Sequence, residues 1–154
     1  MFNEILYNDA LYNDISIETL YVEYTRGSYN SLPTDDANLA TRYTPQDYIK
    51  VSEIDGIYVD QTGEYQYMIH EFKDTIQVAN TCTVTWVGKT NLPPSISPII
   101  LEIYNRDTEL WDQLDSDNSS PSYSNLTLTS EINDLTDYKD TNNYICCRVY
   151  QLAV

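Results

Sequence analysis

The sequence predicts an all-β protein, namely an antiparallel, jelly-roll-like β-sandwich of about eight strands with an extended N-terminal arm. Strand-favouring residues are abundant, including 15 tyrosines, whereas helix-favouring methionine occurs twice. From residue 48 onward, short alternating or apolar runs recur between turn residues, and we find no convincing helix beyond a turn near Glu131–Tyr138. A chain of 154 residues suffices for one domain with its own core.

The chain divides into two expected regions, an arm and linker over residues 1–47 and a sandwich domain over residues 48–154. Within the first region, residues 15–25 alternate between apolar and polar side chains and predict one strand. Residues 26–47 contain Gly27, Pro33, Pro45 and many small polar residues, which indicates a long loop or linker.

The second region supplies the remaining predicted strands. Ile57–Asp60 and Glu64–Phe72 flank Gln61-Thr62-Gly63, a pattern typical of a three-residue hairpin turn. Further strands are expected over Thr81–Val87, Ile99–Tyr104, Leu110–Leu114, Leu126–Thr129 and Tyr144–Leu152. Their inward positions predict a core of Ile57, Val59, Met68, Phe72, Val84, Trp86, Leu101, Ile103, Leu128, Ile145 and Val149.

The chain is strongly acidic, with 24 Asp and Glu against 8 Lys and Arg and a net charge of −16. The excess extends over both halves of the sequence. Such a protein is repelled by nucleic-acid phosphates and by anionic membranes, so we expect no nucleic-acid partner and no membrane insertion. A simple contribution to solubility is the alternative explanation of the charge.

Targeting signals are not visible in the sequence. The opening residues lack a cationic region followed by an apolar one, and no stretch approaches the roughly 20 apolar residues of a membrane-spanning helix. We therefore expect synthesis in a cytosol and a final location in a virion made in the host cytoplasm. An extracellular surface is the alternative location.

Three cysteines, Cys82, Cys146 and Cys147, lack the spacing of metal ligands. Neighbouring residues in a strand point to opposite faces, so we expect Cys82 and one of the other two to be small buried hydrophobes. A disulfide between strands is the less favoured alternative.

Four segments of the second region resemble a known kind of module. They are TVTWVGK at Thr83–Lys89, LEIYN at Leu101–Asn105, WDQL at Trp111–Leu114 and RVYQ at Arg148–Gln151. Together, over residues 55–152, they resemble the galactose-binding-like, jelly-roll sandwich modules that occur in phage structural proteins, among others. The resemblance implies a sandwich that binds sugars in some settings and packs into virions in others, while residues 1–50 resemble no family.

Tyrosines crowd the first fifty residues, where the core pattern is weakest. The arm also carries a direct repeat, LYNDA followed by LYNDI over residues 6–15. Tyrosine is enriched at interfaces, so we interpret the arm as a docking element for a neighbouring subunit. The alternatives are that the tyrosines cover the arm's own domain, or that they form a sugar-stacking platform. The candidate assembly residues are Leu6, Tyr7, Leu11, Tyr12, Tyr21, Tyr24 and Tyr29.

Catalytic chemistry finds little support in the sequence. His70 is the single histidine, and it lies in a predicted strand without an assignable nucleophile nearby, which favours a half-buried or interface histidine. Four glycines, none closely paired, do not form a phosphate-binding loop. We therefore expect a non-enzymatic protein without catalytic residues or a bound organic cofactor.

One metal site is a minor hypothesis. Asp112, Asp115, Asp117 and Asn118 place oxygen atoms at close spacing in an expected loop, and Ca²⁺ prefers oxygen ligands. The glycine and distal glutamate of a helix–loop–helix calcium site are missing, so a solvated loop is the default interpretation.

The leading functional hypothesis is a virion structural protein, a capsid decoration or a head or tail appendage subunit. It would self-assemble and dock on other virion proteins through its tyrosine-rich arm. The alternatives are a carbohydrate-binding adhesin with glycan partners, and a subunit of an extracellular filament joined by strand exchange.

Overall fold

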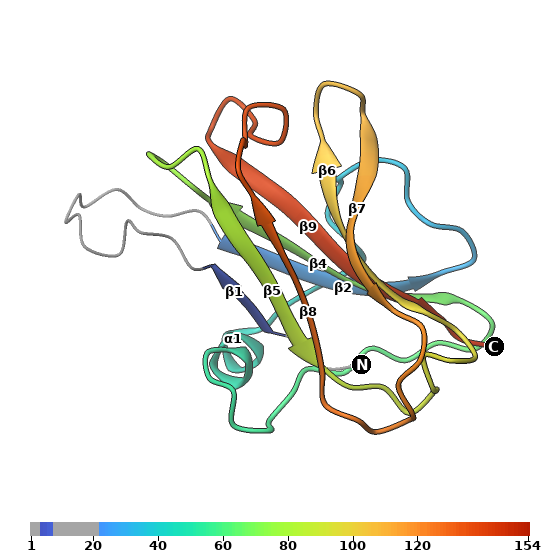
Figure 1. The fold of residues 1–154 in the computed structure, drawn as a ribbon. Coiled ribbons are helices and arrows are strands. Elements are labelled where there is room, and N and C mark those ends of the chain that lie inside the picture. Colours follow the sequence, from blue (N-terminus) through green and yellow to red (C-terminus); the bar gives the residue numbers. More distant parts are fainter. Residues whose placement is uncertain (1–3, 8–21) are drawn as a thin grey trace.

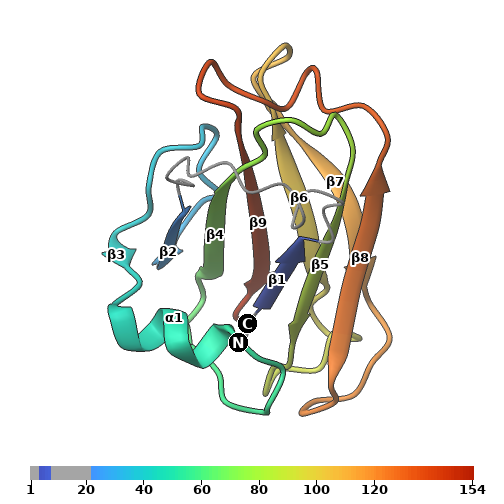
Figure 2. The ribbon, with the colours of Figure 1, turned by 90° about the vertical axis from the view of Figure 1, so that its left-hand side faces the viewer.

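The protein is a two-layer antiparallel β-sandwich, which confirms the predicted fold class (Figures 1 and 2). The computed structural model describes residues 4–7 and 22–154. In that part of the chain, six strands form the larger sheet in the order β3-β2-β4-β9-β6-β7, and three form the smaller sheet in the order β1-β5-β8. The elements are β1 (Glu4–Tyr7), β2 (Val22–Tyr29), β3 (Thr41–Arg42), α1 (Pro45–Val51), β4 (Tyr67–Thr75), β5 (Cys82–Gly88), β6 (Ile99–Asn105), β7 (Leu110–Asp117), β8 (Leu126–Ile132) and β9 (Tyr144–Leu152).

The main core lies between the two sheets and follows from the alternation of each strand. In β5 the even-numbered residues are buried and the odd-numbered ones are partly exposed, so Val84 and Trp86 point inward. Ten of the eleven predicted core residues are buried; the exception is Ile57, which is 55% exposed. Residues 57–63 do not form the first half of a hairpin but an irregular segment, so Ile57 has no strand to direct it inward.

A strap of residues 30–40 covers the opposite, outer face of the larger sheet. It forms a second apolar cluster in which Leu39 packs with Ile69 and Tyr150. The strap also meets charged side chains, because Lys73 donates to the side-chain oxygen of Asn38 at 2.8 Å. The larger sheet is therefore covered on both faces, and strands such as β4 are buried over almost their whole length.

Residues 22–47 consequently belong to the sandwich rather than to a separate arm. β2 pairs with β4 over eight residues, from Val22 opposite Asp74 to Tyr29 opposite Tyr67. The predicted strand at 15–25 is thus observed from residue 22, and the expected boundary at residue 47 falls inside α1. Residues 8–21 lie outside the described part of the chain.

The helix α1 was not predicted, although its start signal is present in the sequence. Thr44 is the N-cap, its hydroxyl accepts from the Asp47 backbone N–H at 3.2 Å, and the Asp47 carboxylate accepts from the Thr44 N–H at 2.9 Å. Pro45 occupies the first turn, where its missing N–H costs nothing. Val51 and Tyr48 attach the helix to the main core at one end of the sandwich (Figure 2).

All three cysteines are buried, and none of them forms a disulfide. Cys82 and Cys147 lie in the main core, as expected for two of them. Cys146 points to the outer face and is nevertheless 0% exposed, so both neighbours are buried, contrary to the prediction. The reason is that the strap turns the outer face into a second interior, and this burial raises the pKa of the Cys146 thiol well above its usual value.

Candidate functional site

The first candidate site is the edge of the smaller sheet, where β1 is added to β5. Their antiparallel register pairs Glu4 with Val87 and Tyr7 with Val84 (Figures 1 and 2). β8 occupies the other side of β5, with Trp86 opposite Leu128. β1 therefore covers a backbone edge that would otherwise present unpaired N–H and C=O groups.

The candidate assembly residues divide between the described and undescribed parts of the chain. Leu6 and Tyr7 lie in β1, opposite Thr85 and Val84. Tyr24 is not available for assembly, because it is 8% exposed and its hydroxyl donates to the Asp74 carboxylate at 3.0 Å. Of the remaining predicted residues, Leu11, Tyr12 and Tyr21 lie outside the described part of the chain.

Tyr29 also differs from its prediction as an assembly residue. Its hydroxyl accepts a hydrogen bond from the backbone N–H of Ala40 at 2.8 Å. Its ring packs against the apolar cluster of Leu39, Ile69 and Tyr150 on the outer face of the larger sheet. Together with Tyr24, Tyr43 and Tyr48, it covers its own domain, as in the alternative interpretation of the early tyrosines. Burial, followed by the nearby Asp74 carboxylate, raises the pKa of Tyr24 well above 10.0.

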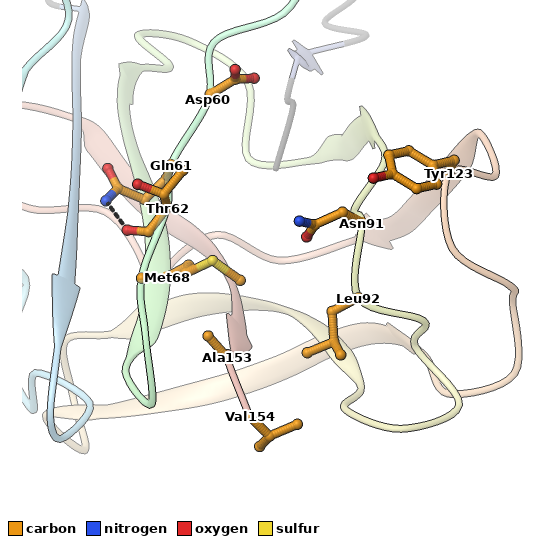
Figure 3. Close-up of a pocket in the computed structure, with 10 residues that line it drawn as sticks. Asp60, Gln61, Thr62, Met68, Asn91, Leu92, Tyr123, Ala153 and Val154 are labelled. Atoms are coloured by element: carbon orange, nitrogen blue, oxygen red, sulfur yellow. Dashed lines mark hydrogen bonds between the residues drawn. The ribbon is translucent and has the colours of Figure 1, made fainter.

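The second candidate site is an open cleft of about 430 Å³ at one end of the sandwich (Figure 3). One wall is the irregular segment before β4, and the other combines the turn after β5 with the loop before β8. Figure 3 shows Met68 reaching into the space from one side and Leu92 from the other, with the last residues of the chain below them. The lining residues are Asp60, Gln61, Thr62, Gly63, Met68, Asn91, Leu92, Tyr123, Ala153 and Val154.

A buried glutamine fixes the second wall of the cleft. Gln151 is 0% exposed, and its amide donates to the carbonyls of Leu92 at 3.1 Å and Ser97 at 2.7 Å. Its oxygen accepts from the Thr90 hydroxyl at 2.6 Å. A buried amide with these partners holds the connection between β5 and β6 in one conformation.

The first wall is attached to β2 by a second set of hydrogen bonds. The Gln61 amide donates to the Ser28 hydroxyl at 2.9 Å, and that hydroxyl in turn donates to the carbonyl of Thr62. Gly63 permits this close approach, since a Cβ atom there would lie 3.0 Å from Ser28 Oγ and 3.1 Å from Met68 Cγ. Hydrogen bonds within the chain therefore hold both walls of the cleft.

The β7 aspartates (Asp112, Asp115 and Asp117) all lie in a strand, and Asn118 directly follows it, so the expected loop is not observed over these residues. Each carboxylate accepts hydrogen bonds from a different part of the chain. Asp112 accepts from the Tyr138 hydroxyl, Asp115 from the Thr129 backbone N–H, and Asp117 from residues of the following turn. In the described part of the chain, no group of three acidic, histidine or cysteine side chains is placed to hold a metal ion.

Hydrogen bonds from the turn after β7 also shift the pKa of Asp117. Partial burial raises it, but hydrogen bonds from the hydroxyl and amide of Ser120 and from the amide of Ser119 outweigh burial and leave the pKa below its ordinary value. Both oxygens of Asp117 thus accept hydrogen bonds from donors of the same chain. On an edge strand, such charges oppose pairing with another chain.

His70 is fully buried, which is deeper than the half-buried position predicted for it. Its Nδ1 lies 2.6 Å from the Tyr43 hydroxyl, and its ring stacks on Phe72. A histidine in this position cannot meet a dissolved substrate without unfolding of the core.

Comparison with protein-family models, curated proteins and solved structures found no match to this chain. Among residues 4–7 and 22–154, no helix has the length and apolar character needed to cross a membrane.

Proposed function

We propose that the chain is a non-enzymatic structural subunit that assembles by strand exchange, with β1 of one copy added to β5 of the next. The particular setting we propose is a virion, as a capsid decoration or a head or tail appendage protein. The observation that carries the proposal is the position of β1, a four-residue strand whose described pairing is with the edge of β5 alone.

Strand exchange requires that the same backbone pairing can form within a chain or between chains. The pairing in the structure is antiparallel and spans four residues, from Glu4 to Tyr7. Fourteen residues separate Tyr7 from Val22, so the chain length permits β1 to reach a neighbouring copy when two sandwiches are in contact. The β1 strand of a second copy can then bond to the same N–H and C=O groups at the edge of β5, and neither sandwich has to change its fold.

Two further properties support a structural role. Sandwiches of this general architecture build many virus shells and appendages, where rigid bodies are joined by terminal strands. The net charge of −16 opposes premature contact between free subunits, and salt or a cationic partner reduces that repulsion. The single histidine, being buried, leaves little for general acid–base catalysis by that residue type.

The test is light scattering across a concentration series for the native chain and two substitutions in β1. Leu6→Pro places a residue without a backbone N–H inside this four-residue strand and disfavours its pairing, whereas Leu6→Val keeps a strand-favouring residue and is a matched control. We expect the native chain and Leu6→Val to form oligomers and Leu6→Pro to remain monomeric and folded. A defined mass favours an appendage or decoration subunit, and a mass that keeps growing favours the filament alternative. Equal masses for all three chains would contradict the proposal.

A further inference from the structure

We propose that Lys73 and Asn38 form an isopeptide bond, a covalent amide cross-link between their side chains, with Glu71 as the proton acceptor. Lys73 Nζ lies 2.8 Å from the side-chain oxygen of Asn38 and 3.7 Å from Glu71 Oε1. A lysine amine that has lost its proton is a nucleophile, and the carboxamide carbon of asparagine is the atom it can attack. None of the three residues lies in β1 or β5, so the proposal does not depend on strand exchange.

Strand geometry places the amine and the carboxyl group together beneath the strap. Glu71 and Lys73 are two residues apart in β4 and therefore point to the same face of the larger sheet. Glu71 is 1% exposed and Lys73 is 6% exposed, although both are charged residue types. Glu71 Oε1 has no hydrogen-bond partner among the described residues. Such an oxygen is costly to the fold, and its position beside an amine suits it to proton transfer.

The strap holds Asn38 against the amine from both sides. Leu39 is 6% exposed, and its backbone N–H donates to the Thr25 hydroxyl at 3.0 Å. On the other side of Asn38, the Asp36 carboxylate accepts from Arg106 at 2.9 Å. Because these contacts keep the two reacting groups together, the reaction is intramolecular and needs no encounter step. Asn38 itself is exposed to solvent, which gives released ammonia a route out.

The reaction balances without an external reagent. Glu71 takes one proton from the Lys73 ammonium group, and burial favours this transfer because it raises the pKa of Glu71 to about 8. The neutral Nζ then forms a bond to Cγ of Asn38. The Cγ–Nδ2 bond breaks, and Nδ2 leaves as ammonia with a second proton from the lysine nitrogen. The product is a neutral amide, so the buried ammonium charge is removed as well.

The test is intact mass spectrometry of the full chain, followed by tryptic peptide mapping under denaturing conditions. The cross-linked chain should be lighter than its sequence mass by about 17 Da, the mass of one ammonia molecule. Trypsin does not cleave after an acylated lysine, so peptide 27–42 should be joined to peptide 51–89. A succinimide formed from an asparagine also loses ammonia but joins no peptides, so the map distinguishes the two products.

Four variants locate the reaction. Glu71→Gln keeps the size of the side chain but removes the proton acceptor, and Lys73→Met removes the nucleophile, so both should keep their full sequence mass. Asn38→Ala should also keep its full mass and should lower the Tm by roughly 10 °C, because the cross-link joins residues 35 positions apart. Asn30→Ala is a matched control, since Asn30 is also an exposed strap residue and its side-chain oxygen accepts from Gln66 at 3.2 Å. It should show the mass loss and a Tm close to that of the native chain.

The proposal is overturned if the native chain has its full sequence mass, or if the mass loss persists in Lys73→Met. It is also overturned if the mass is lower but peptides 27–42 and 51–89 are not joined. A joined pair of peptides that still forms in Glu71→Gln would overturn the role assigned to Glu71.

Discussion

The buried ion pair between Arg148 and Glu102 allows a quantitative prediction about the outer face of the larger sheet. Arg148 is 4% exposed, and its Nε and Nη2 lie 2.7 and 2.6 Å from Glu102 Oε2. Its Nη1 donates to the carbonyl of Pro33 in the strap at 2.7 Å, and its guanidinium lies 4.0 Å from the centre of the Trp111 ring. One side chain thus connects β9, β6, β7 and the strap.

Replacing Arg148 with Met keeps most of the side-chain length but leaves the Glu102 carboxylate buried without its cation. Removal of one partner of such a pair costs about 3–5 kcal/mol of unfolding free energy. For a chain of this size, that corresponds to a fall in Tm of about 10 °C. The measurement is urea unfolding followed by tryptophan fluorescence and circular dichroism.

Two controls separate this loss from a general effect of removing arginine. Arg42→Met breaks an ion pair with Glu23 in which the arginine side chain is 74% exposed, so the expected loss is below about 1 kcal/mol. Arg148→Met combined with Glu102→Leu should be less destabilised than Arg148→Met alone, because the carboxylate that has lost its cation is then removed as well. A loss below about 1 kcal/mol for Arg148→Met, or a double variant that is as unstable as the single one, would refute the reasoning.

Three further predictions follow from the same structure. Burial raises the pKa of Glu71 to about 8, despite the opposing effect of Lys73, from an ordinary value of 4.5. Between these two pH values the native state holds a proton that the unfolded state releases, so the unfolding free energy should fall as the pH rises from 4.5 to 8. Glu71→Gln should lessen that fall. A variant with the same pH profile as the native chain would contradict the assignment of the effect to Glu71. Tyr24→Phe should lower the unfolding free energy by about 1–2 kcal/mol because the bond to Asp74 is lost, and urea titration checks this; a neutral result would contradict it. Finally, Tm should agree within about 1 °C in CaCl₂ and in EDTA, since the β7 aspartates are occupied by protein donors, and a clear rise with calcium would restore the metal hypothesis.

The part of the fold that the sequence predicts best is the inter-sheet core. Strands β5, β6, β8 and β9 have period-two patterns bounded by turn residues, and each is observed within a few residues of its expected limits. These patterns are local, so they can be read from a single sequence. Trp86 and Leu128, for example, are both predicted inward and lie opposite each other in the structure.

The outer face of the larger sheet could not be predicted in the same way. Glu71, Lys73 and Arg148 have the composition of a solvated strand face, yet the strap buries all three. That burial depends on contacts between residues far apart in the chain, such as Arg148 with Pro33, which no local pattern encodes. The same difficulty affected Tyr24, whose partner Asp74 lies fifty residues away.

The candidate sites also differ in how far a local sequence pattern could locate them. Leu6 and Tyr7 were selected from a repeat and lie in a strand at a sheet edge, and their role in assembly stays a prediction. The cleft was not predicted, because Gln61-Thr62-Gly63 resembled a hairpin turn and Tyr123 lay in a polar loop. The signal that could have located α1 was the Thr44-Pro45 start with Asp47 at the third helical position.

The most direct test of strand exchange is disulfide trapping between two differently sized copies of the chain. One copy carries Glu4→Cys and the other Val87→Cys, two positions that are opposite each other in the β1–β5 register. The control copy carries Thr83→Cys, which lies on the same side of β5, is also half-buried, and is beyond the four paired residues. Strand exchange predicts a mixed disulfide dimer of Glu4→Cys with Val87→Cys and much less with Thr83→Cys. If no mixed dimer forms, while a single chain carrying both Glu4→Cys and Val87→Cys closes its own disulfide, β1 stays with its own sandwich and the proposed assembly is wrong.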